Sequence, residues 1–239
     1  MGLAEIFDRT DLAAVLTFLG GWTIYNLVVD HSPLSRLGLS QRMNVQREAW
    51  MQTLVRRDLR MIDTAIMAGL QQGTGFFASA CIFAIGGCFA LIGSSEQIMT
   101  IVTDLPLEGG ASRALVEAKL LGLVTIFAYA FFKFGWAYRL FNYCSILIGA
   151  IPMRSDADGA PAEAAFALDR ALAMNRIAAR HFNAGLRGIF FGLAYLGWFV
   201  GPGVLIGTTA LVICILAHRQ FLSDAVRSVG VDSPSKESP

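Results

Sequence analysis

The chain has 239 residues, of which 55% are hydrophobic and 15% are charged, whereas soluble domains are about 45–50% apolar and about 25% charged. This composition excludes an ordinary soluble domain and indicates an integral membrane protein. The net charge of +1 excludes the global basic field that would draw the chain to nucleic acid.

The first apolar run, residues 12–29, is expected to be a retained transmembrane helix. The residues before it have neither a basic n-region nor a small-residue cleavage site, so they do not match a signal peptide. A bilayer core about 30 Å thick needs about 20 helical residues. Residues 74–93, which carry no charge, and residues 114–138 meet this need and are expected to form the second and third spans.

Two shorter apolar segments, 186–200 and 204–217, are expected to form the fourth and fifth spans. They are divided by Gly201-Pro202-Gly203, and such a segment breaks a helix. One uninterrupted span over both would be too long for the bilayer, whereas local thinning accommodates two short spans. Both outer flanks of the pair are basic and the turn is uncharged, which favours a hairpin with both ends on one side of the membrane.

The distribution of arginine orients these spans through the positive-inside rule. The loop 94–112 holds three acidic residues and no cation, whereas the segments before the second and fourth spans are rich in arginine. We therefore expect a multi-pass protein of the bacterial cytoplasmic (inner) membrane, with its N-terminus outside and its C-terminus in the cytoplasm. The arginines that indicate the cytoplasmic side are Arg36, Arg42, Arg47, Arg56, Arg57 and Arg60, then Arg154, Arg170, Arg176 and Arg180.

The predicted fold is all-α, a polytopic membrane helical bundle whose long helices extend into a cytoplasmic helical layer. These extensions are expected over residues 43–72, 139–151 and 162–185, where helix formers dominate. The first is expected to run without a break into the second span, giving one helix of about 50 residues. Residues 1–227 then form a single membrane domain, and residues 228–239 a disordered tail.

The stretch YAFFKFGWAYRLFNYCSILIGAIP, residues 129–152, places Lys133 and Arg139 among aromatic residues. If the third span begins at Arg113, about 20 residues bring the helix to its cytoplasmic boundary near Lys133, whose long side chain reaches the head groups. The aromatic residues around it then form an interfacial belt. We favour this anchoring role for the two cations, and a functional lysine inside the membrane is the alternative.

Two runs of the sequence resemble the signature segments of a known family. They are FFKFGWAYRLFNYCSILIGAIP, residues 131–152, and RHFNAGLRGIFFGLAYLGWFVGP, residues 180–202. Over about residues 10–227 the chain is similar to membrane proteins of bacteria and plants that are grouped as domain of unknown function 599. This resemblance implies a multi-span helical membrane protein, and it carries over no catalytic, metal or substrate residue.

A basic stripe on the fourth helix is the strongest candidate site. Four of its residues lie at i, i+4, i+7 and i+11 from Arg176, hence on one helical face, and cations of the third helix are expected at a similar depth. Together they would form a pocket for an anionic lipid head or a small anion. Alternatively, the arginines pair with Glu48, Asp58 and Asp63 and fix the topology. The candidate ligand- or lipid-binding residues are Lys133, Arg139, Arg176, Arg180, His181, Asn183 and Arg187.

No metal site, cofactor or catalytic residue is predicted. The sequence lacks a Walker loop and a G-x-S-x-G elbow. The histidines His31, His181 and His218 all fall near the predicted cytoplasmic boundary, but no HxxxH or HExxH spacing accompanies them, and metal or haem ligation stays an open alternative. Four cysteines lie in apolar segments without a CxxC pair and are expected to be buried hydrophobic residues: Cys81, Cys88, Cys144 and Cys214.

The expected function is a non-enzymatic scaffold or accessory role at the cytoplasmic face. Its expected partners are membrane lipids, and a second copy of the chain or another membrane protein, but no nucleic acid. The alternative is a small oligomeric transporter or channel subunit for an ion or small anion, because broken helices often bind ions and Glu117 and Lys119 lie where an outer vestibule would be. A lipid-modifying enzyme is a third class, with His181 and either Asp63 or Glu48 as its acid–base pair.

Overall fold

The computed structural model describes residues 7–94, 112–153 and 161–229, and within these ranges it contains helices and no strand. The predicted all-α class is therefore confirmed. The acidic loop over residues 95–111, Arg154 and the tail residues 230–239 lie outside the described residues. In chain order the elements are α2 (Arg9–His31), η1 (Pro33–Leu37), α3 (Leu39–Val55), α4 (Met61–Gly93), α6 (Arg113–Gly149), α8 (Pro161–Tyr195), α9 (Gly197–Val200), α10 (Pro202–Ala217), η2 (His218–Leu222) and α11 (Asp224–Val229).

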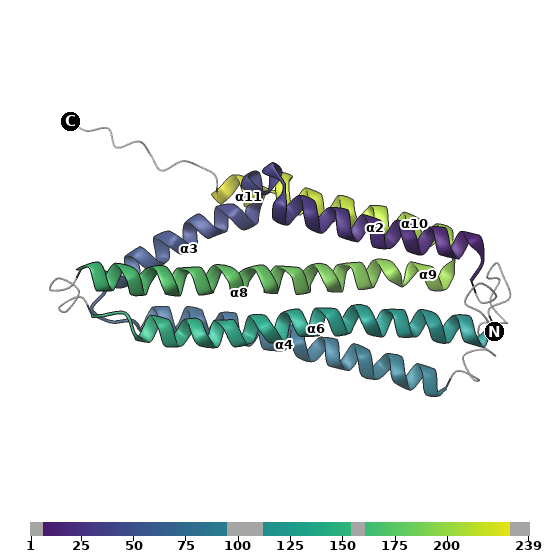
Figure 1. Ribbon diagram of the computed structural model, residues 1–239, viewed down its shortest axis with the longest axis horizontal. Coiled ribbons are helices and arrows are strands. Elements are labelled where there is room, and N and C mark those ends of the chain that lie inside the picture. The colour runs from purple at the N-terminus through teal and green to yellow at the C-terminus, as the bar shows by residue number, and fades with distance from the viewer. Residues whose placement is uncertain (1–6, 95–111, 154–160, 230–239) are drawn as a thin grey trace.

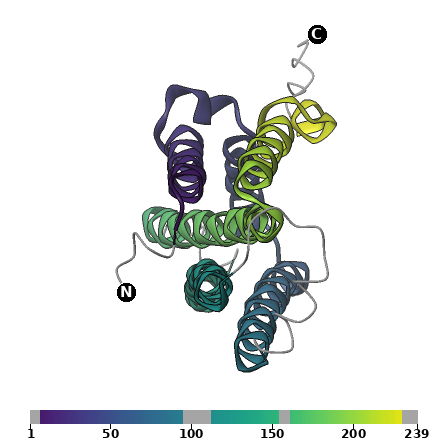
Figure 2. The same cartoon turned by 90° about the vertical axis from the view of Figure 1, so that its right-hand side faces the viewer.

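The long helices run side by side along the long axis of an elongated molecule (Figure 1). Helix α8 is the central element: α2 and α10 lie on one side of it, and α6 followed by α4 on the other (Figure 2). Helices α2 and α10 accompany only one half of α8, and α3 packs against the other half. The molecule thus has an α2–α10 half and an α3 half, which meet where α2 ends.

Close packing between α6 and α8 follows from small residues on α8. A Cβ atom on Gly188 would lie 3.1 Å from the Cβ of Ala130 and 3.3 Å from the Tyr129 ring, so glycine lets the two helices approach. Separate apolar clusters then fill the two halves. Phe18 and Phe191 are almost fully buried in the α2–α10 half, and Met51 and Phe141 in the α3 half.

The expected continuous helix over residues 43–93 is wrong, because α3 ends at Val55 and α4 begins at Met61. Side-chain contacts hold this break. Arg57 leaves the helical path to pair with Asp63 at 2.5 Å. Arg60 turns to the end of α6, where it donates hydrogen bonds to the carbonyl oxygens of Ile148, Ile151 and Pro152. The break lets α3 cross to α8 while α4 stays on α6.

The chain reverses direction at the Gly201-Pro202-Gly203 segment. Helix α9 ends at Val200, and Pro202 occupies the first turn of α10, where its missing N–H is not needed. The two arms of this hairpin are close, since a Cβ atom on Gly197 would lie 2.5 Å from Oγ1 of Thr208. Thr208 also donates a 2.7 Å hydrogen bond to the Ala194 carbonyl and so joins α10 to α8.

Four described helical stretches are long and apolar enough to cross a membrane: Arg9–His31, Met61–Gly93, Arg113–Gly149 and Pro202–Val229. Residues 186–200, expected as a further span, do not meet this criterion by themselves. They are divided between α8 and α9, and the α8 part contains Arg187. The chain is therefore a membrane-type helical bundle, with α8 as its least apolar long helix.

The cysteines are all free thiols within the described ranges, but they do not share one environment. Cys81, Cys88 and Cys144 are buried, as expected for small hydrophobic residues. Cys214 is exposed, which corrects the expectation that all four would be buried. It lies on α10 next to exposed Ile215, whereas Leu216 of the same helix turns into the apolar cluster. The pattern of apolar residues around Cys214 does not reveal which face of α10 packs against α2 and α8.

Candidate functional site

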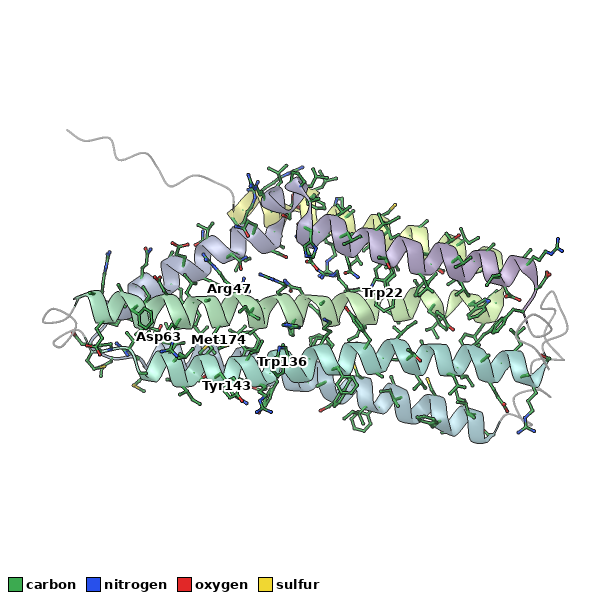
Figure 3. The ribbon with its side chains drawn as sticks, viewed as in Figure 1. Trp22, Arg47, Asp63, Trp136, Tyr143 and Met174 are labelled. Atoms are coloured by element: carbon green, nitrogen blue, oxygen red, sulfur yellow. The ribbon has the colours of Figure 1, made fainter. Side chains whose placement is uncertain are left out.

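A cavity of about 200 Å³ opens where the two halves of the molecule meet. One wall is α8, and the other is formed by the end of α2, by η1 and by the first half of α3. Four arginines line it, Arg47 from α3 and Arg176, Arg180 and Arg187 from α8, and we call it the arginine cavity. Figure 3 shows Arg47 in the space between α3 and α8.

Local sequence builds both walls of the arginine cavity. The α8 wall is the stripe of residues at helical spacing, and Asn183 completes it. The opposite wall exists because Pro33 begins a short 3₁₀ turn after α2 and redirects the chain into α3. Polar side chains then face α8 at matching intervals, and Asn183 donates a 3.3 Å hydrogen bond to Oγ of Ser40 across the gap.

Two of the four cavity arginines have carboxylate partners. Arg187 pairs with Asp30 of α2 at 2.6 Å, and Arg176 pairs with Glu48 of α3 at 2.7 Å. The pairing with Glu48 matches the sequence-based alternative, whereas Asp30 was not among the expected partners, and Asp63 pairs with Arg57 instead. Each pair ties α8 to the opposite wall of the cavity.

The remaining two arginines carry charge without an acidic partner among the described residues. Arg47 donates only a 3.0 Å hydrogen bond to the amide oxygen of Asn44. No hydrogen bond or ion pair joins Arg180, which is exposed, to another described residue. Burial, and then the nearby charge of Arg176, lower the pKa of Arg47 from its ordinary value. Positive charge is therefore crowded in the cavity, and an anion would relieve the repulsion.

Buried donor atoms strengthen the case for an anion. Arg187 is 7% exposed, and its Nε is buried without a hydrogen-bond partner although its Nη2 is paired with Asp30. Nε of Arg176 is in the same situation. Buried donors that lack partners are costly, by about 1–3 kcal/mol each, so two of them beside one cavity point to a site for acceptor oxygens.

The predicted site residues outside the stripe do not line this cavity. Lys133 lies 5.3 Å from the Tyr129 ring, and His181 packs against Trp136 with ring centroids 6.5 Å apart. Burial, and then the charges of Lys133 and Arg180, lower the pKa of His181 from its ordinary value.

Arg139 is also absent from the lining of the arginine cavity. It donates a 2.6 Å hydrogen bond to the hydroxyl of Tyr143, which is also on α6. Figure 3 shows Tyr143 on the side of α6 that faces away from Arg47 and the α3 wall. The structure thus brings four of the seven predicted residues together and leaves three outside, and a binding role stays a prediction for all of them.

A second, more apolar cavity of about 350 Å³ adjoins the arginine cavity, and we call it the apolar chamber. Apolar side chains of four helices line it: Tyr25 of α2, Leu39 and Met43 of α3, Leu186 and Phe190 of α8, and Leu216 of α10. The two cavities share five lining residues, which come from α8 and from the opposite wall: Val29, Ser40, Arg47, Asn183 and Arg187.

The contributions of α2, η1 and α3 to these cavities were missed from the sequence. A signal was present, because Ser40, Asn44 and Arg47 recur at i, i+4 and i+7 and mark one polar face of α3. The partner of Arg187 was harder to find. Asp30 lies at the end of the first apolar run, 157 positions from Arg187, and only the fold brings the two together.

A second cluster of buried charge lies at the opposite end of the α2–α10 half. Lys119 is 8% exposed and donates a 2.8 Å hydrogen bond to the Trp198 carbonyl, and the Trp198 indole N–H donates to Asp11 at 2.6 Å. These contacts join α2, α6 and α9. Glu117, expected near Lys119, pairs with Arg113 at 2.8 Å instead. Within the described ranges, no three histidine, cysteine, aspartate or glutamate side chains gather as a metal site requires.

These features define the class of protein: an all-α membrane-type bundle with an arginine-lined cavity between its two halves. The chain belongs to the family described as Protein of unknown function, DUF599, whose model matches residues 13–225. No curated protein and no solved structure matches the chain. Family membership thus agrees with the resemblance in the sequence, and the cavity is the feature from which a function is argued.

Proposed function

We propose that this protein is an integral membrane protein that binds the anionic head group of a lipid in the arginine cavity. The observation that carries the proposal is the charge balance of the cavity. Four arginines face it, and two carboxylates, Asp30 and Glu48, pair with two of them. Two positive charges thus remain for a ligand: that of Arg47, which is partly buried and therefore screened less by salt, and that of Arg180, which is exposed.

The proposed topology has five crossings. Helices α2, α4, α6 and α10 are apolar enough to cross by themselves, and α8 with α9 lies between them. A central helix need not be apolar all round, because its polar residues face protein rather than lipid. With the arginine-rich half in the cytoplasm, the N-terminus is outside and the C-terminus inside, as in a bacterial inner-membrane protein.

The depth of the arginine cavity suits a lipid head group. Asp30 and His31, at the end of the proposed first crossing, line it together with the first residues of the proposed cytoplasmic half. In the proposed topology, lipid head groups would lie at this level. Guanidinium groups present forked donors that match phosphate oxygens, and each hydrogen bond to a charged group contributes about 1.5–3 kcal/mol.

The proposed role is an accessory one, in which a bound lipid is held beside a surface for protein partners. The α3 half exposes large apolar side chains, among them Ile146, Met153 and Phe166. Exposed apolar residues grouped on one part of a molecule are typical of interaction surfaces. A second copy of the chain or another membrane protein would cover them.

A transport role has less support from the packing. Between the arginine cavity and the far end of the α2–α10 half, Phe18, Trp22, Phe191 and Tyr195 pack against one another. Their ring centroids are between 5.3 and 5.9 Å apart, and Phe18 and Phe191 are almost fully buried. An ion that moved along α8 through the α2–α10 half would have to pass this aromatic cluster.

The proposal is tested by the affinity of the purified protein for a short-chain phosphatidic acid, measured by native mass spectrometry in a neutral detergent. Arg47→Gln and Arg180→Gln should each weaken binding about tenfold, which corresponds to about 1.4 kcal/mol. Arg170→Gln is the matched control, because Arg170 is exposed on the same helix and lies over the Phe166 ring, away from the cavity. Affinities within twofold of the wild type for both cavity variants would contradict the proposal.

A further inference from the structure

The arginine cavity and the apolar chamber are two parts of one amphipathic space. Arg47 of α3 and Arg187 of α8 line both parts, so these two residues stand at the boundary between a charged and an apolar environment. A ligand with only a charged group would use the first part alone. The adjoining apolar part calls for a ligand that also carries hydrocarbon.

The position of the apolar chamber indicates where that hydrocarbon lies. Tyr25 and Leu216 belong to α2 and α10, two helices that meet the membrane-spanning criterion, whereas Arg47 and Arg176 belong to the walls near α3. A chain in the chamber would thus point toward the membrane half, with its head toward the α3 half. A volume of about 350 Å³ accommodates on the order of ten methylene-sized groups. One hydrocarbon chain therefore fits, with its far end in lipid.

The C-terminal segment forms the remaining wall of the apolar chamber. Arg219 lies 5.3 Å from the Phe190 ring, and Gln220 donates a 3.3 Å hydrogen bond to Oγ of Ser40. Arg42 of α3 donates a 2.9 Å hydrogen bond to the carbonyl oxygen of Val226 in α11. Residues of η2 and α11 therefore line the chamber on this side, and Arg219 is the third arginine among its lining residues.

The charge of the site selects among anionic heads. Of the four cavity arginines, Arg47 and Arg180 have no carboxylate partner among the described residues. A phosphate monoester carries about −1.5 to −2 charges at pH 7, whereas a phosphodiester or a carboxylate carries one. Two unmatched cations are therefore balanced by a monoester and only half balanced by the others.

We propose that the ligand is a single-chain amphiphile with a phosphate monoester head, its phosphate between Arg47 and Arg180 and its chain in the apolar chamber. This inference rests on the proposed function and specifies the class of its lipid.

The experiment compares four ligands by native mass spectrometry of the full chain in neutral detergent. Oleoyl lysophosphatidic acid has one chain and a monoester, and oleoyl lysophosphatidylglycerol has one chain and a diester. Glycerol 3-phosphate has the monoester without the chain, and oleate has the chain with a carboxylate. We expect lysophosphatidic acid to bind at least about tenfold more tightly than each of the others.

A variant that fills the apolar chamber tests the chain separately from the head. Met43→Trp places a larger side chain in the chamber. It should weaken the binding of lysophosphatidic acid about tenfold and leave the affinity for glycerol 3-phosphate unchanged. Val45→Trp is the matched control on α3, because Val45 is 57% exposed and lines neither cavity.

Each contrary result identifies the part that is wrong. If glycerol 3-phosphate binds as tightly as lysophosphatidic acid, or Met43→Trp changes nothing, the chain does not occupy the chamber, and the inference is overturned while the proposed function stands. If lysophosphatidylglycerol, the diester, binds as tightly as lysophosphatidic acid, the preference for a phosphate monoester head is wrong. If Arg180→Gln weakens the binding of none of the anionic ligands, the proposed function itself is wrong.

Discussion

Asp63 is a fully buried carboxylate that holds the junction between α3 and α4. It accepts hydrogen bonds from the indole N–H of Trp50 at 2.8 Å and from Arg57 at 2.5 Å, and Figure 3 shows it near the end of the α3 half. Its partners lie on α3 and in the break, while Asp63 itself begins α4. Asp63 thereby helps to fix the wall that carries Arg47, together with the pair between Arg176 and Glu48.

Replacing Asp63 tests this role at the residue scale. Asp63→Ala removes the acceptor of the Trp50 indole N–H and the partner of Arg57, whose side chain is 31% exposed, and losing such an acceptor costs about 1–3 kcal/mol. The melting temperature of the detergent-solubilised protein should fall by on the order of 5 °C. Asp224→Ala is the control, since its pair with Arg227 is exposed and such pairs contribute about 0–1 kcal/mol. Equal melting temperatures for the two variants would contradict the role.

At the scale of elements, the features that depend on local sequence patterns could be predicted from the sequence. The length of α8 followed from helix formers after Pro161, and the stripe on α8 followed from its spacing. The break over residues 56–60 could not be predicted, because the segment holds no glycine or proline and the contacts that stabilise it come from α4 and α6. The polar face of α3 was visible in the sequence, but its place opposite α8 could not be predicted without the break that lets α3 cross to α8.

The hairpin of α9 and α10 gives a prediction for an element contact. In Gly197→Ala the new Cβ would lie 2.5 Å from Oγ1 of Thr208 and 3.1 Å from the Val204 carbonyl oxygen, so the helices must separate. Overpacking of this kind costs about 1–3 kcal/mol. Gly207→Ala on α10 meets nothing within 4 Å and should be neutral or stabilising, because alanine is the better helix former. Thermal unfolding of both variants checks the difference, and an unchanged Gly197→Ala protein would refute the close contact.

At the scale of the whole molecule, the account depends on the two halves lying in different surroundings. The α2–α10 half contains the proposed crossings, with α8 at their centre, and the α3 half projects beyond them (Figure 1). The arginine cavity lies between the halves, where a membrane surface would be. A lipid bound there would touch both the bilayer and the surface that the α3 half offers to partners.

The positions of the two termini distinguish a topology with five crossings from one with four. Five crossings put the termini on opposite sides, whereas four crossings without α8 put them on the same side. We expect a tag at the N-terminus to react with an impermeant label in intact cells and a tag at the C-terminus to react only after the cells are opened. Labelling of both tags from one side would show that α8 does not cross the membrane, and it would contradict the placement of the cavity at head-group depth.

The most direct measurement is the mass of whatever stays bound when the protein is extracted from its own membrane in a mild neutral detergent. We predict one single-chain phosphate monoester per chain on the wild type and on Arg170→Gln, and its loss from the double variant Arg47→Gln/Arg180→Gln. Equal occupancy in the double variant and the wild type would show that the bound lipid lies elsewhere and would contradict the account.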